Sequence, residues 1–170
     1  MYVFHDTVGL IHLITAIIAL ITGTMILTTK KGTQNHKRIG YVYVVSMTGL
    51  LITAFMIYRL WGGWGLFHYA ALVSSVTLLG GFVPIIFKYP KKNYIAYHFS
   101  FMYWSVLGLY GAFFAEIMTR LPRIVIEEGR PNAIFLNMTG LAVALVMGFG
   151  GYYFYKNKDR WENEFSSVPD

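Results

Sequence analysis

Five apolar runs, each about twenty residues long, constrain the fold of this chain more than any other feature. About twenty helical residues cross the roughly 30 Å of hydrocarbon in a lipid bilayer. Because lipid offers no partner to backbone N–H and C=O groups, each run is expected to form a helix. The sequence therefore predicts an all-α integral membrane bundle of five transmembrane helices, forming a single domain over residues 1–170. The predicted spans are residues 8–27, 39–60, 66–87, 94–118 and 134–155.

The amino-acid composition also indicates that the chain lies in a lipid bilayer. Of the 170 residues, 56% are hydrophobic and 13% are charged, whereas about 25% are charged in a typical soluble domain. The chain contains no cysteine, which excludes disulfides, a thiol nucleophile, iron–sulfur clusters and cysteine-based zinc sites. The net charge of +6 lies in loops beside the apolar runs, so it predicts contact with the lipid bilayer and no nucleic-acid partner.

The basic residues alternate between the two sides of the predicted bundle. Loops on one side carry Arg59, Arg120, Arg123 and Arg130. The positive-inside rule assigns the more basic side to the cytoplasm, which predicts an N-terminus outside and a C-terminus inside a cell membrane. The basic residues of that predicted inner side are Lys30, Lys31, Lys37, Arg38, Lys88, Lys91, Lys92, Lys156, Lys158 and Arg160.

Four of the five histidines fall in four consecutive runs. Alternate helices run parallel, so His12 and His68 share a depth near the outer face, and His36 and His98 share one near the inner face. Two neutral imidazoles from different helices can ligate a haem iron from opposite sides of the macrocycle. The spacing therefore predicts two bis-His haem b sites that would carry electrons across the membrane. Interhelical hydrogen bonding by the same histidines is the structural alternative.

The residues beside His36 are consistent with such a site. Lys37 and Arg38 follow it directly in the chain. Their charges could receive the propionates of a bound haem, or could serve only to orient the chain in the membrane. His36 itself could also be a solvated interfacial residue, and His5 is expected at the surface.

The stretch 11–23 and the segment 36–43, His-Lys-Arg-Ile-Gly-Tyr-Val-Tyr, resemble a family of small bacterial multi-pass membrane proteins catalogued as a domain of unknown function. That resemblance implies a bacterial cytoplasmic membrane and no assigned activity. The order of histidines is also distantly similar to that of the di-haem transmembrane cytochromes b that oxidise ascorbate. This second resemblance implies an outer haem on His12 and His68, an inner haem on His36 and His98, and a quinone or another redox partner. The chain departs from those cytochromes in having five predicted spans instead of six.

Glu116 supports a competing hypothesis. It lies 18 residues after His98, and eighteen steps of about 100° return to the same helix face. His12, His68 and Glu116 would then supply two imidazoles and a carboxylate, a known zinc ligand set, in an intramembrane zinc-dependent hydrolase. An ion pair between Glu116 and Arg120 is the structural alternative. A non-catalytic membrane assembly or partner subunit is the third possibility, so the sequence leaves open whether the protein is an enzyme.

Overall fold

The fold is seen in a computed structural model that describes residues 7–58, 62–119, 126–127, 130–131 and 133–166. The five helices are α1 (Thr7–Thr28), α2 (Gln34–Met56), α3 (Leu66–Phe87), α4 (Tyr94–Thr119) and α5 (Ala133–Ser166). Each contains a segment long and apolar enough to cross a membrane, which confirms the predicted all-α architecture of five spans. The strands β1 (Ile126–Glu127) and β2 (Arg130–Pro131) pair antiparallel between α4 and α5 and were not predicted.

Local sequence signals set the helix boundaries that differ from prediction. α2 begins at Gln34 instead of 39, because the hydroxyl of Thr33 accepts a hydrogen bond from the backbone N–H of His36 and so caps the helix. This cap places His36 inside the first turn of α2. α5 continues past residue 155 to Ser166, because the charged segment 156–160 contains neither Gly nor Pro to end it.

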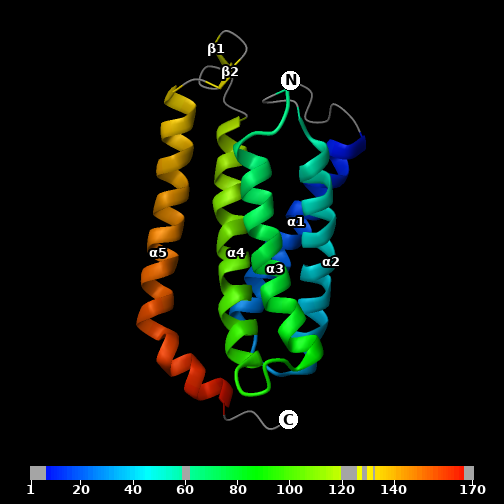
Figure 1. The fold of residues 1–170 in the computed structure, drawn as a ribbon, viewed down its shortest axis with the longest axis vertical. Helices are drawn as coiled ribbons and strands as arrows, with labels where there is room; N and C mark the ends of the chain where they lie inside the picture. Colours follow the sequence, from blue (N-terminus) through cyan, green and yellow to red (C-terminus); the bar gives the residue numbers. More distant parts are fainter. Residues whose placement is uncertain (1–6, 59–61, 120–125, 128–129, 132, 167–170) are drawn as a thin grey trace.

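The helices run alternately up and down, with α5 at one edge (Figure 1). α1 packs along α2, α3 packs along α4, and a smaller contact between α2 and α3 joins the two pairs. α5 packs on α4, and its last part bends toward the end of α4 where the α3–α4 connection lies (Figure 1). The bundle therefore closes around α1 to α4 and carries α5 on its flank.

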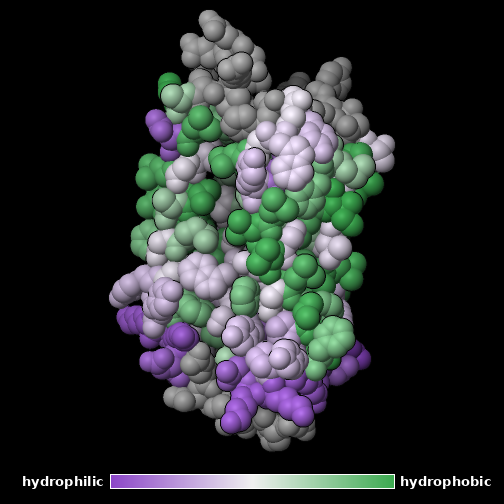
Figure 2. Space-filling model, in the orientation of Figure 1, coloured by the Kyte–Doolittle hydropathy of each residue, from purple (hydrophilic) through white to green (hydrophobic). Residues whose placement is uncertain are grey.

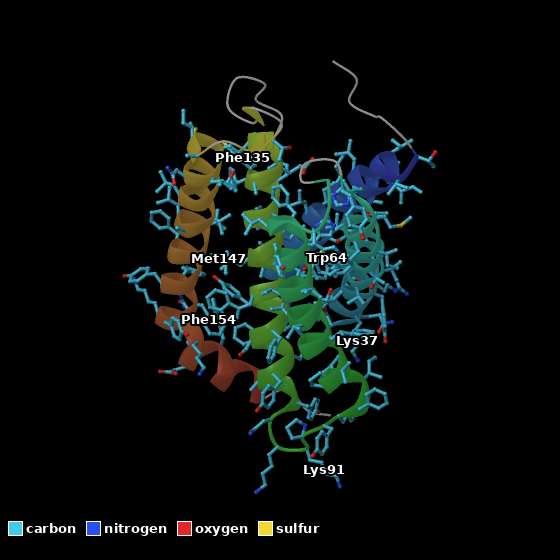
Figure 3. All side chains as sticks on the ribbon, turned by 45° about the horizontal axis from the view of Figure 1, so that its top comes forward. Lys37, Trp64, Lys91, Phe135, Met147 and Phe154 are labelled. Carbon is cyan, nitrogen blue, oxygen red and sulfur yellow. The ribbon has the colours of Figure 1, made fainter. Side chains whose placement is uncertain are left out.

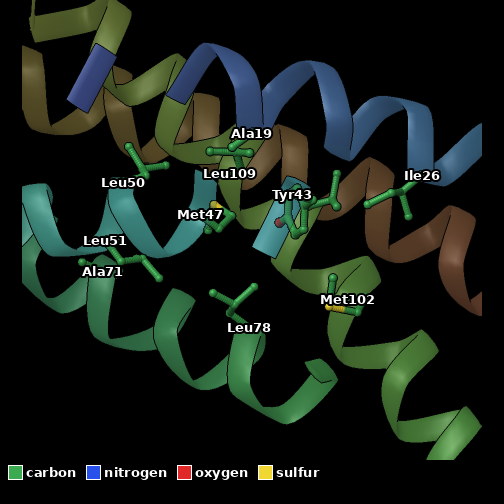
Figure 4. Close-up of a cluster of buried hydrophobic side chains, with 11 residues drawn as sticks. Ala19, Ile26, Tyr43, Met47, Leu50, Leu51, Ala71, Leu78, Met102 and Leu109 are labelled. Carbon is green, nitrogen blue, oxygen red and sulfur yellow. The ribbon is translucent and has the colours of Figure 1, made fainter. Parts of the chain in front are cut away.

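A buried apolar cluster holds α1 to α4 together (Figure 4). Tyr43 and Met47 of α2 lie at its centre and are almost fully buried. A Cβ built on Gly23 of α1 would lie 3.1 Å from the Tyr43 ring and 3.3 Å from Val106, so this glycine leaves the space in which both side chains sit. The Tyr43 hydroxyl shares a hydrogen bond of 2.8 Å with Ser105 Oγ, which satisfies both buried groups.

On the face shown in Figure 2, many side chains at mid-height are hydrophobic, and most of the strongly hydrophilic side chains gather at one end. Val45 is 72% exposed and Phe149 is 74% exposed, as expected for side chains that face lipid rather than water. We call the polar end the lysine-rich end. It contains the α1–α2 and α3–α4 connections, with Lys30, Lys31, Lys37, Lys88, Lys91 and Lys92.

Candidate functional site

A cavity of about 790 Å³ opens at the lysine-rich end. All five helices contribute to its lining, and most of that lining is apolar or aromatic. The polar side chains in it include His36 and His98, and three lysines that are described below. A concave, mainly apolar site of about 300–1,000 Å³ with a few placed polar groups is typical of small-molecule and cofactor sites.

The imidazoles of His36 and His98 meet in this cavity. Their ring centroids lie 6.4 Å apart, and their planes are nearly perpendicular at 89°. His36 comes from the first turn of α2, and His98 comes from the second turn of α4. The structure thus brings together the two histidines that direction reversal places at one depth near the predicted inner face.

The hydrogen bonding of His98 leaves a nitrogen lone pair available. Its Nδ1 lies 2.8 Å from the carbonyl oxygen of Gly81 on α3. A carbonyl only accepts, so Nδ1 carries the proton and donates it, and the neutral ring keeps its lone pair on Nε2. Histidines that bind metals commonly hold their other ring nitrogen in this way, because the bond fixes both tautomer and orientation.

Two glycines allow α3 to supply that carbonyl. A Cβ on Gly80 would lie 2.7 Å from the Phe101 ring, and a Cβ on Gly81 would lie 2.7 Å from Met102. Without side chains at these two positions, α3 and α4 approach closely enough for the hydrogen bond to His98. Pro84 follows in α3 and lacks a backbone N–H, so the helical hydrogen bonding is also interrupted beside this contact.

His36 has an unsatisfied nitrogen at the same place. Its Nδ1 is buried and makes no hydrogen bond within the part of the chain that the structure describes. A buried polar atom without a partner costs about 1–3 kcal/mol. Within the described residues His68 Nε2 and Thr139 Oγ1 are in the same condition, so this atom alone does not mark a ligand site. Together with the lone pair of His98, this atom marks the cavity as a place where a ligand can bind.

The separation of the two rings suits a shared metal ion. Two metal–nitrogen bonds of about 2 Å, with about 1 Å from each nitrogen to its ring centre, give about 6 Å between the centroids of opposed ligands. The observed centroid separation of 6.4 Å is close to this value. The ring separation, the available nitrogens and the mainly apolar lining are compatible with a haem, which His36 and His98 would hold.

His68, at the opposite end of the bundle, has a different arrangement. It is 2% exposed and stacks between Tyr58 and Trp64, with ring centroids 4.9 and 5.2 Å away. The backbone N–H of Gly65 donates to its Nδ1 over 3.2 Å, so the ring proton resides on Nε2. A ring nitrogen that holds its proton has no lone pair for a metal, so this tautomer suits a helix cap better than a ligand.

His12 and Glu116 do not complete a metal site with His68. His12 Nδ1 lies 3.0 Å from Thr53 Oγ1, which ties α1 to α2. No group of three or more His, Asp or Glu side chains within the described ranges is placed to hold a metal ion, so the predicted zinc ligand set is not assembled. Arg120, the predicted partner of Glu116, lies outside the described residues, as does His5.

Lys31 is a residue of this site that the sequence interpretation did not single out. Its Nζ donates to the carbonyl oxygens of Ile26, Leu27 and Thr29, with distances of 3.1 and 3.2 Å to the last two, and so caps the C-terminal end of α1. Burial lowers the pKa of Lys31 from its usual value. A lysine just after a helix end is a sequence signal for such a cap, but its place in the cavity depends on the fold.

The fold and this cavity define an integral membrane protein of the helix-bundle class, with a histidine-containing site at one end. The chain belongs to the family described as "Predicted membrane protein (DUF2306)", which matches residues 9–149. This match confirms the expected membership of a membrane protein family of unknown function, and it includes all four intramembrane histidines. No curated protein and no solved structure matches the chain.

Proposed function

We propose that this protein is a b-type haem protein that transfers electrons in a cell membrane, with its haem held by His36 and His98. The observation that carries the proposal is the pair of imidazoles from α2 and α4, 6.4 Å apart in a cavity of about 790 Å³. A bound haem would supply one-electron redox chemistry. The proposal places one haem at the lysine-rich end.

The residues of the chain would have distinct roles at this site. The carbonyl of Gly81 orients His98 and keeps its Nε2 unprotonated for the iron. Burial of the Nδ1 of His36 favours the neutral ring that a ligand must have. The apolar walls, among them Val44 and Phe82, exclude water, which favours low charge on the site and so tunes its reduction potential.

The position of the proposed haem in the membrane determines which redox partners could reach it. The positive-inside rule predicts that the lysine-rich end faces the cytoplasm, where this haem would exchange electrons with a quinone or another redox partner. An outer haem on His12 and His68 has less support, because Nδ1 of His68 accepts a hydrogen bond and leaves the proton on Nε2. Transfer across the whole membrane would need that second site or a second protein.

A visible spectrum of the detergent-purified protein tests the proposal. Dithionite should produce the sharp bands of a low-spin b-type haem, and metal analysis should find iron. His36→Ala and His98→Ala should each abolish these bands, whereas His12→Ala removes an imidazole outside the cavity lining and should retain them. Stoichiometric zinc without haem would overturn the proposal, and so would bands that are lost in His12→Ala but kept in His98→Ala.

A further inference from the structure

The cavity opens beside three lysine side chains. Lys31 comes from the α1–α2 connection, Lys37 from the first turns of α2, and Lys88 from the residue that ends α3. All three line the cavity, and none of the described residues that line it is acidic. One end of this mainly apolar cavity therefore carries several positive charges.

The backbone fixes where these lysines lie. Lys88 adopts the left-handed conformation with a φ of 48°, which ends α3 and turns the chain toward α4. Lys37 follows His36 directly on α2 and is exposed, whereas Lys31 is half-buried against the end of α1. The three lysines thus line the cavity from three different parts of the chain, at the lysine-rich end of the bundle.

We infer that Lys37 and Lys88 form an anion-binding rim that holds the carboxylates of the molecule in the cavity. Lys31 is not part of this rim, because its three N–H groups are donated to carbonyl oxygens at the end of α1. This inference rests on the proposed haem site. A haem is an amphiphile, with an apolar macrocycle and two propionates on one edge. The apolar chamber takes the macrocycle, and the ammonium groups attract the propionates to the polar end. The propionate edge then faces the lysine-rich end of the bundle.

The test compares haemin with haemin dimethyl ester, which has the same macrocycle without free carboxylates. The full-length protein, freed of haem in detergent, is titrated with each compound, and binding is followed by the change in Soret absorbance. The wild type should bind haemin more tightly. Exposed charge pairs of about 0.2–1 kcal/mol each correspond to a preference of about two- to thirtyfold for two pairs.

Two double variants distinguish the effect of charge on the rim from the effect of charge elsewhere at the lysine-rich end. Lys37→Gln with Lys88→Gln should reduce the preference for haemin to near one and leave the affinity for the ester unchanged. Lys91→Gln with Lys92→Gln removes the same charge from the same end and should keep the preference, because neither lysine lines the cavity. Lys91 lies in the α3–α4 connection and points away from the bundle (Figure 3).

The other possible results of the titration contradict either the rim or the haem site itself. Equal wild-type affinity for haemin and its ester overturns the rim and leaves the haem site intact. Failure to bind either compound overturns the proposed function itself. An anionic phospholipid offers the same chemistry through its phosphate. If haemin binds far more weakly in nanodiscs containing phosphatidylglycerol than in phosphatidylcholine nanodiscs, and the Lys37 and Lys88 variant abolishes that difference, the rim belongs to lipid headgroups and the propionate assignment is wrong.

Discussion

The close contact between α3 and α4 at Gly81 gives a quantitative prediction. In Gly81→Ala the new Cβ would lie 2.7 Å from Met102 Cγ and Sδ and 3.0 Å from the Met102 backbone nitrogen. A side chain can rotate away, but a backbone atom cannot, so the two helices must separate. Overpacking of this kind costs about 1–3 kcal/mol. Separation also carries the Gly81 carbonyl away from its 2.8 Å contact with His98 Nδ1.

Gly108→Ala is the matched control for this variant. Gly108 lies on α4, and the nearest atom to a Cβ built at this position is Ser74 Oγ at 4.0 Å, an ordinary contact. Both substitutions gain the same helix propensity, up to about 1 kcal/mol, so their difference isolates the steric contact. We expect Gly81→Ala to unfold about 2–12 °C below Gly108→Ala in the same detergent.

The assay is thermal unfolding followed by circular dichroism, with haem content measured on the same samples. Since Gly81 fixes the orientation of His98, haem affinity should fall in Gly81→Ala by about 10–100-fold, as for other residues that orient a metal ligand. It should remain unchanged in Gly108→Ala. Equal melting temperatures for the two variants would refute the packing argument, and unchanged haem content would refute the positioning role of the carbonyl.

Three further predictions concern the core, the α1 cap and the topology. Tyr43→Phe leaves Ser105 Oγ without its partner and should cost about 1–3 kcal/mol of unfolding free energy. Adding Ser105→Ala should recover part of that free energy. A greater loss of stability in the double variant would contradict this reasoning. Burial lowers the pKa of Lys31, so the unfolded chain binds more protons than the folded one between the folded pKa and 10.5. Stability should therefore rise with pH through that alkaline range, and the rise should be smaller in Lys31→Met, measured by urea unfolding. A reporter fused after Asp170 should register as cytoplasmic, and an external signal would refute the predicted orientation.

The sequence alone determined the five helices and their order. Apolar length and the absence of charge are local properties, and in lipid they leave the backbone only helical hydrogen bonding. The parallel direction of alternate helices also placed His36 and His98 at one depth before any packing was known. The helices α2 and α5 extend beyond the predicted spans because the cap at Thr33 and the charged extension 156–160 act outside the apolar runs.

Only the tertiary structure decided which histidine nitrogens are available. Three histidines differ in their partners: His98 donates to Gly81 on α3 and His12 contacts Thr53 on α2, whereas His68 accepts from Gly65, only three residues away in the chain. A tautomer depends on the atom that lies about 3 Å away, and that atom can come from another helix. Likewise, no local signal places Lys31 and Lys88 at one cavity, because their approach depends on how closely α1 to α4 pack. Spacing along the chain sets the depth of a residue, and helix packing sets which atoms it meets.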